Sequence, residues 1–209
     1  MSGYLTVKGE CENTTVIERS KFICYIKHIE NEDEAKEYVE EIRKKHSFAR
    51  HNCFAYIADG LGLNQKFSDA GEPQGTAGMP MLNVLKSKKI YKTVAVVARY
   101  FGGIKLGTGG LVRAYGGAVS ECLKNAEIVD MQPIKRITFT TNYDEYSKII
   151  KLVENKTFAI ANTEFSQDVK MTLAVKGGEN ELQSFIKTLE DIKKGQVLLE
   201  SVEDGFYPF

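Results

Sequence analysis

TVAVVARYFGGIKLGTGGLVRAY, residues 93–115, contains in order an apolar strand, a glycine-rich turn and the start of a helix. Residues 93–101 are almost continuously apolar, which predicts a central strand that is buried on both faces. Beyond the turn, residues 111–126 carry apolar side chains at helical spacing, which predicts a helix that packs along one face. This stretch therefore predicts a core built from both a sheet and helices.

The sequence before residue 93 adds elements of both kinds. Apolar or alternating residues predict strands at 22–26 and 53–58. Asn31, with Glu34 three positions later, has the pattern of a capping box, which predicts the start of a helix. A short helix is predicted after the glycine-rich segment 71–80. The first 130 residues thus predict one domain of mixed strands and helices.

The pattern of elements starts again after residue 130. The predicted elements are, in order, a strand at 136–141, a helix from Asp144, strands near 157–165 and 168–175, a helix from Asn180 and a strand at 196–201. This β-α-β-β-α-β order is that of ferredoxin-like domains. We therefore expect an α+β chain with two domains, residues 1–130 and residues 131–209.

The bulk composition is that of a globular protein. The chain has 209 residues, 43% of them hydrophobic, and its formal net charge is zero. No apolar stretch approaches the roughly 20 residues that a membrane span needs, and the first residues lack the pattern of a signal peptide. We therefore expect a cytoplasmic protein without membrane contact. A net charge of zero argues against a surface that is basic throughout, although it is compatible with a local basic patch.

No metal or cofactor is predicted. The four cysteines are scattered, without the clustered spacing that a structural zinc site needs. Lys105 precedes Gly107, which departs from the order of a P-loop, and Val112 stands where a dinucleotide fingerprint needs glycine or alanine. We therefore expect neither a bound metal nor a nucleotide cofactor.

Two glycine clusters, GEPQGTAGMP (71–80) and GGIKLGTGG (102–110), each run directly into a predicted helix. A helix N-terminus offers free N–H groups to an anion, and glycine allows a phosphate to approach closely. Alternatively, these glycines only allow tight turns and close packing. On the first interpretation, the residues predicted to bind phosphate or nucleic acid are Arg50, Arg99, Lys105, Arg113, Gly75, Thr76, Gly107, Gly109 and Gly110.

An acid–base site is the competing interpretation of the same region. His51 could act as a general base with Asp69 or Glu72 as the carboxylate that orients it. Alternatively, the three residues have only structural roles. His51 would then form a hydrogen bond at the start of its strand, and the carboxylates of Asp69 and Glu72 would cap backbone N–H groups in the turn. Arg99 could equally form an internal ion pair with Asp69 or Glu72. His51, Asp69 and Glu72 are therefore candidate catalytic residues, although no particular reaction is predicted for them.

Four motifs resemble the YigZ/Impact family. They are ERSKFIC (18–24), RHNCFAY (50–56), SDAGEPQGTAGMP (68–80) and ARYFGGIKLGTGGLVRAY (98–115). The resemblance implies an N-terminal fold of the ribosomal-protein and elongation-factor-G-domain-IV type with a left-handed βαβ crossover, followed by a ferredoxin-like C-terminal domain. Ala70 stands where many relatives carry a second Asp. Eukaryotic relatives regulate translation by binding an activator of a stress kinase, so the resemblance also implies a protein partner.

These observations leave three functions open. We favour a non-enzymatic binding or regulatory protein that is linked to translation through RNA, the ribosome or a translation-regulator partner. The second is an enzyme that acts on a phosphorylated small molecule or peptide with His51, Asp69 and Glu72. The third is a pure protein-interaction module. The sequence does not indicate the oligomeric state.

Overall fold

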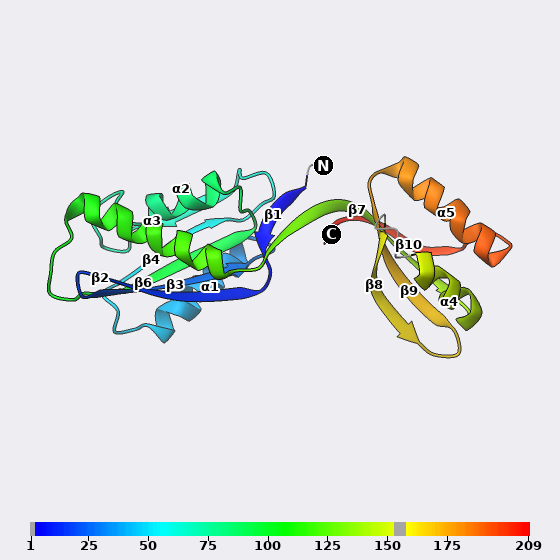
Figure 1. Cartoon of the computed structure of the whole chain (residues 1–209), viewed down its shortest axis with the longest axis horizontal. Helices are drawn as coiled ribbons and strands as arrows, with labels where there is room; N and C mark the ends of the chain where they lie inside the picture. The colour runs from blue at the N-terminus through cyan, green and yellow to red at the C-terminus, as the bar shows by residue number, and fades with distance from the viewer. Residues whose placement is uncertain (1–2, 153–157) are drawn as a thin grey trace. The chain divides into compact units, whose positions relative to one another are not determined.

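The computed structural model describes residues 3–152 and 158–209, and the chain divides into two compact units. One unit is Tyr4–Val129, and the other is formed mainly by Asp130–Phe209. Both contain helices and antiparallel sheets, so the predicted α+β class is confirmed (Figure 1). No helix within the described residues is long and apolar enough to cross a membrane.

The first unit is built on a five-stranded sheet in the order β2-β3-β6-β4-β5. The strands are β2 (Glu10–Ile17), β3 (Ser20–His28), β4 (His51–Ile57), β5 (Gln65–Ser68) and β6 (Thr93–Tyr100), with β1 (Tyr4–Val7) ahead of them. The central strand is β6, and seven of its eight residues are buried. Its continuous apolar sequence therefore predicted its position correctly, because such a strand needs cover on both faces.

Helices cover both faces of this sheet. The α1 helix (Glu32–Lys45) packs on one face against Val94 and Val96. The α2 helix (Gly78–Ser87) and the α3 helix (Gly107–Asn125) pack on the other against Ala95 and Val97. Because side chains alternate along a strand, the α2/α3 face also receives Arg99, two residues beyond Val97.

The helix ends differ in detail from the sequence predictions. The α3 helix begins at Gly107, four residues before the predicted start, because its first turn is made of glycine and threonine rather than apolar residues. The Asn31 side chain caps α1 as predicted and accepts hydrogen bonds from the N–H groups of Asp33 and Glu34. The Glu34 carboxylate accepts the N–H of Glu30 instead of closing a capping box on Asn31.

The second unit has the β-α-β-β-α-β order that the sequence predicts. Its strand order is β10-β7-β9-β8. The elements are β7 (Ile128–Thr141), α4 (Tyr143–Leu152), β8 (Phe158–Phe165), β9 (Val169–Lys176), α5 (Glu179–Lys193) and β10 (Leu199–Pro208). The more detailed likenesses, to elongation factor G and to a left-handed crossover, stay predictions.

The junction between the units lies inside a continuous strand. The sequence predicts a break around 130–133 and no strand before Arg136, yet β7 runs from Ile128 without interruption. Pro133 was the misleading residue, because proline cannot donate a hydrogen bond within a sheet. It is tolerated here because pairing with β9 begins only at Ile134.

Candidate functional site

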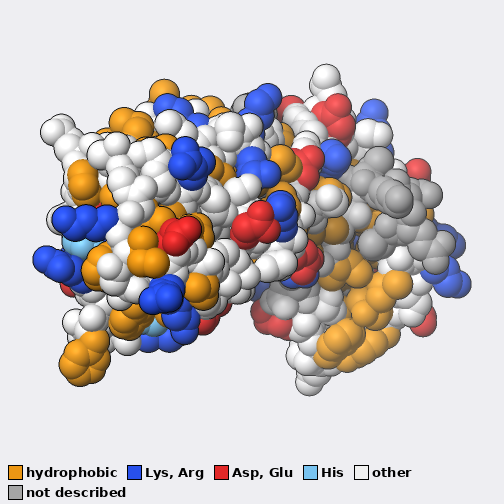
Figure 2. All heavy atoms as spheres, turned by 60° about the vertical axis from the view of Figure 1, so that its left-hand side comes forward, with side chains coloured by type: hydrophobic (Ala, Val, Ile, Leu, Met, Phe, Trp, Pro, Cys, Tyr) orange, Lys and Arg blue, Asp and Glu red, His pale blue; other side chains and the backbone are white. Residues whose placement is uncertain are grey.

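An open cleft of about 350 Å³ lies at the end of β6 on the α2/α3 face. Three segments line it: the start of β4, the loop that precedes α2, and the chain from Arg99 to Leu111. Its walls combine basic side chains with apolar ones. Figure 2 shows Lys and Arg side chains beside hydrophobic side chains on the face turned to the viewer.

The sheet register brings the ends of three strands together at this cleft. Arg99 pairs with His51 of β4 on one side and with Phe22 of β3 on the other. Cys53 and Phe22 belong to the core beneath α2 and α3, so His51 and Arg99 face the same side. His51 and Arg99, which are 48 positions apart in the chain, therefore lie next to each other because β4 pairs directly with β6.

A buried ion pair closes the inner end of the cleft. The Nη1 atom of Arg99 donates to Oε1 of Glu72 at 2.7 Å, and the hydroxyl of Tyr115 donates to the same oxygen at 2.7 Å. The side chains of Arg99 and Glu72 are only 7% and 4% exposed. Burial, together with the nearby Cys53 and Glu72, raises the pKa of Tyr115 well above its usual value, so its hydroxyl keeps its proton. Glu72 thus neutralises Arg99, and its Oε1 atom accepts two hydrogen bonds.

Asp69 closes the N-terminus of α2. Its carboxylate accepts the N–H groups of Gly75, Ala77 and Gly78 at 2.8, 3.0 and 2.9 Å. Gly75 has a φ of +75°, which the tight turn requires. Thr76 is buried and donates its hydroxyl to the carbonyl of Pro73. Gly75 and Thr76 are not part of the cleft lining. The backbone N–H groups at this helix N-terminus, which were predicted to bind a phosphate, already bind the carboxylate of Asp69.

The N-terminus of α3 opens into the cleft. Gly107, with a φ of +69°, and Thr108 line the wall, and Leu106 at the N-cap makes no side-chain capping bond. The first turn contains no acidic residue. The segment before it is held by Gly102, whose N–H donates to Ser20 Oγ, and a Cβ there would lie 2.0 Å from the backbone of Arg19. Only glycine fits that position.

The remaining predicted cations are split between the cleft and the open surface. Arg50 and Lys105 are exposed and line the cleft. Arg113 is also exposed but lies outside the lining, as do Gly109 and Gly110 in the first turn of α3. Of the nine predicted anion-binding residues, the structure therefore brings together Arg50, Arg99, Lys105 and Gly107.

His51 is oriented by the backbone rather than by a carboxylate. Its Nδ1 atom lies 2.9 Å from the carbonyl oxygen of Ala70, which can only accept, so Nδ1 carries the proton. The other ring nitrogen, Nε2, is then a free acceptor on a residue that lines the cleft. Ala70 itself has a φ of +45°, a region that Asp and Asn enter more readily than alanine.

Sequence reasoning did not assign Phe101 to the site or Tyr115 to the ion pair of Arg99 and Glu72. Phe101 lines the cleft and is 49% exposed, although it directly follows a buried strand. Tyr115 was assigned only to the apolar face of its helix, and its hydroxyl proves to bind Glu72. An aromatic residue at the exposed end of a core strand was the available signal for Phe101. No comparable signal existed for Tyr115, because 43 residues separate it from Glu72.

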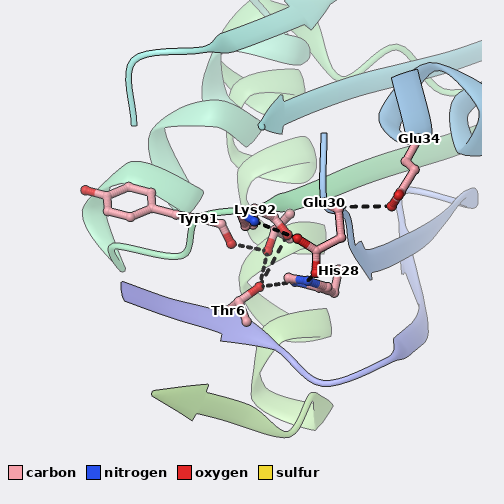
Figure 3. A network of polar contacts seen from close by, with 7 residues as sticks. Thr6, His28, Glu30, Glu34, Tyr91 and Lys92 are labelled. Atoms are coloured by element: carbon pink, nitrogen blue, oxygen red, sulfur yellow. Dashed lines mark hydrogen bonds and ion pairs between the residues drawn. The ribbon is translucent and has the colours of Figure 1, made fainter. Parts of the chain in front are cut away.

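A second cluster of polar side chains joins β1 to the sheet (Figure 3). The Thr6 hydroxyl lies 2.8 Å from Nδ1 of His28, and Nε2 of His28 lies 3.1 Å from Oε1 of Glu30. Lys92 binds the other oxygen of Glu30 at 2.6 Å. The order hydroxyl, imidazole, carboxylate resembles a nucleophilic triad. Thr6 is only 1% exposed, so its hydroxyl cannot reach a substrate and the cluster is structural.

Possible metal ligands are dispersed. Across residues 3–152 and 158–209, no three His, Cys, Asp or Glu side chains gather closely enough to hold a metal ion. Cys53, near the cleft, is buried and donates to the carbonyl of Asp69, and burial raises the pKa of its thiol to about 12. It is therefore an unreactive thiol at neutral pH.

The fold and the cleft define an α+β protein whose first unit carries the candidate site. A sequence model of the Impact N-terminal domain matches residues 18–123, about half of the chain, and this segment contains all the residues that line the cleft. The chain belongs to this family, and the resemblance carried by the four motifs is confirmed.

The relatives extend the match over nearly the whole chain. The IMPACT family member YvyE of Bacillus subtilis (strain 168) is 39% identical, over 94% of this chain and 89% of the relative. The IMPACT family member YigZ of Escherichia coli (strain K12) is 36% identical, over 90% of this chain and 92% of the relative. A crystal structure of a hypothetical protein is 34% identical with a TM-score of 0.64, and the alignment covers 97% and 98% of the two chains.

Proposed function

We propose that this chain is a non-enzymatic binding protein linked to translation, and that its cleft holds a phosphate group of RNA. The observation that carries the proposal is the open N-terminus of α3, which lines the cleft without a capping side chain or an acidic residue in its first turn. Such a terminus carries a partial positive charge and free N–H donors, which suit a phosphate.

The charges around the cleft favour an anion. Arg50 and Lys105 are exposed on its lining, and neither lies within 4.0 Å of an acidic side chain among the described residues. Glu72, the acidic residue of the lining, is neutralised by Arg99. The cleft therefore presents two uncompensated cations beside a helix N-terminus, while the whole chain has a net charge of zero.

The test is the salt dependence of RNA binding by Lys105→Ala, measured by fluorescence anisotropy with single-stranded RNA. If the Lys105 ammonium contacts one phosphate, the slope of log K against log salt should become shallower by about 0.7, the value for one contact on a single strand. The matched control is Lys86→Ala, which removes the same charge from an exposed site near the end of α2. Equal effects of the two variants, or no effect of either, would remove the proposed phosphate site.

The enzyme hypothesis retains one specific observation, which is the free Nε2 of His51 in the cleft. In that case His51 would act as a general base oriented by the Ala70 carbonyl, with a phosphorylated small molecule or peptide as substrate. Asp69 and Glu72 would not take part directly, because both carboxylates are engaged elsewhere. His51→Asn keeps a donor for Ala70 and removes the base. If the wild type turns over a panel of phosphate esters and His51→Asn does not, the enzyme hypothesis replaces the binding one.

A further inference from the structure

We propose that Phe101 is a stacking surface for a nucleobase, so that the cleft takes one unstacked nucleotide of single-stranded RNA rather than the backbone of a duplex. The inference deepens the proposed function and rests on the phosphate site at α3. The observation that carries it is the combination of a half-exposed aromatic ring and uncompensated cations on the lining of one cleft.

The ring of Phe101 is held in place before any ligand arrives. The guanidinium carbon of Arg99 lies over two aromatic rings, 5.4 Å from the centroid of Phe22 and 5.6 Å from that of Phe101. The ion pair with Glu72 holds Arg99 in place. Gly102, which follows Phe101 in the chain, donates its backbone N–H to Ser20 Oγ. A ring whose neighbours are fixed loses little conformational entropy when a base stacks on it.

The composition of the cleft calls for a ligand with two chemically different parts. Inorganic phosphate needs only N–H groups and cations, which Arg50, Lys105 and the first turn of α3 supply. The lining also contains apolar side chains, namely Pro73, Leu106 and Leu111, in addition to Phe101. A nucleotide joins a flat apolar base to an anionic phosphate within one small molecule. A volume of about 350 Å³ lies at the small end of ligand pockets, which suits a single unit.

A base that is paired and stacked within a helix cannot enter such a cleft. The base must be unstacked, as it is in single strands, loops and bulges, where aromatic side chains commonly receive it. The sequence of the RNA should matter little, because every base has a flat face that can stack on the ring.

The experiment compares Phe101→Leu with Phe101→Tyr, using a single-stranded oligonucleotide that contains 2-aminopurine. We expect Phe101→Leu to lower the affinity about tenfold, within the range of one base–aromatic stacking contact, and to abolish the quenching of 2-aminopurine on binding. Phe101→Tyr should keep both the affinity and the quenching at the wild-type level, because a tyrosine ring also stacks on a base. The matched control, Phe48→Leu, changes a phenyl ring that is 94% exposed outside the cleft and should leave both unchanged.

Two further measurements separate this inference from the proposed function. An abasic ribose-phosphate oligomer should bind wild type and Phe101→Leu equally, and a perfect RNA duplex should bind more weakly than the single strand. If Lys105→Ala changes the salt slope while Phe101→Leu changes nothing, the phosphate site stands and the stacking inference is overturned. If neither variant alters binding, both proposals fail.

Discussion

The two glycine-rich loops of the first unit have similar sequences but opposite roles. Both lead into helices that pack on the same face of the sheet. In the loop before α2, the Asp69 carboxylate takes three backbone N–H groups and closes the helix N-terminus. In the loop before α3, no side chain caps the terminus, and Gly107 lines the cleft. The glycines set the turns in both loops, whereas a single carboxylate decides which helix end is available to a ligand.

The largest effect should come from breaking the ion pair that joins the loop before α2 to the central strand β6. Glu72→Gln leaves Arg99 buried and uncompensated, so the free energy of unfolding should fall by about 3–5 kcal/mol in urea denaturation. Arg99→Met should cost a similar amount, and the double variant should cost less than the sum of the two. Strictly additive losses would mean that Glu72 and Arg99 do not couple this loop to β6.

An intermediate effect is expected at the closed helix end. Asp69→Ala leaves the N–H groups of Gly75, Ala77 and Gly78 without their acceptor, so unfolding should become about 2 kcal/mol easier. Sulfate should stabilise this variant more than it stabilises the wild type, because the opened terminus can then receive an anion. Asp33→Ala is the control, since Asn31 caps that helix and the loss should be only a few tenths of a kcal/mol. Equal sulfate responses in wild type and Asp69→Ala would contradict the comparison.

The smallest effect concerns the open helix end. Gly109→Ala and Gly117→Ala each add one methyl group to α3. The new Cβ would lie at an ordinary contact distance of 3.7 Å from Nη1 of Arg113 at position 109 and would meet nothing within 4 Å at position 117. Both should therefore raise the free energy of unfolding by about 0.5–1 kcal/mol. Only Gly109 lies in the first turn, so only Gly109→Ala should weaken RNA binding if a phosphate approaches that turn closely. Unchanged binding would mean that this glycine serves the helix alone.

Much of the fold could be predicted because its signals are local. The apolar run of β6 and the periodic face of α3 are continuous in sequence, and the Asn31 cap lies beside the residues it binds. The path of β7 through Pro133 could not be predicted, because it depends on where β9 begins to pair. For the same reason, the sequence left Arg99 with alternative partners, and only the packing of the loop before α2 selects Glu72.

The candidate site was predicted as a region but not as a set of contacts. The two glycine clusters and their cations indicated an anion site, and Arg50, Lys105 and Gly107 do line one cleft. The assignment of Gly75 and Thr76 to the same surface depended on the direction of their N–H and hydroxyl groups. That direction is set by positive φ angles at Ala70, Gly71 and Gly75, which the glycine pattern alone does not specify.

The contacts of Glu72 also have a consequence for the order of folding. Asp69 captures N–H groups only six to nine residues ahead, so the end of α2 can close as soon as that short segment collapses. Glu72 reaches 27 residues to Arg99 and 43 residues to Tyr115, so its bonds must wait until the central strand and α3 have docked. Contacts at long sequence separation carry the larger loop-closure entropy and slow folding. The cleft is therefore expected to be among the last parts of the first unit to assemble.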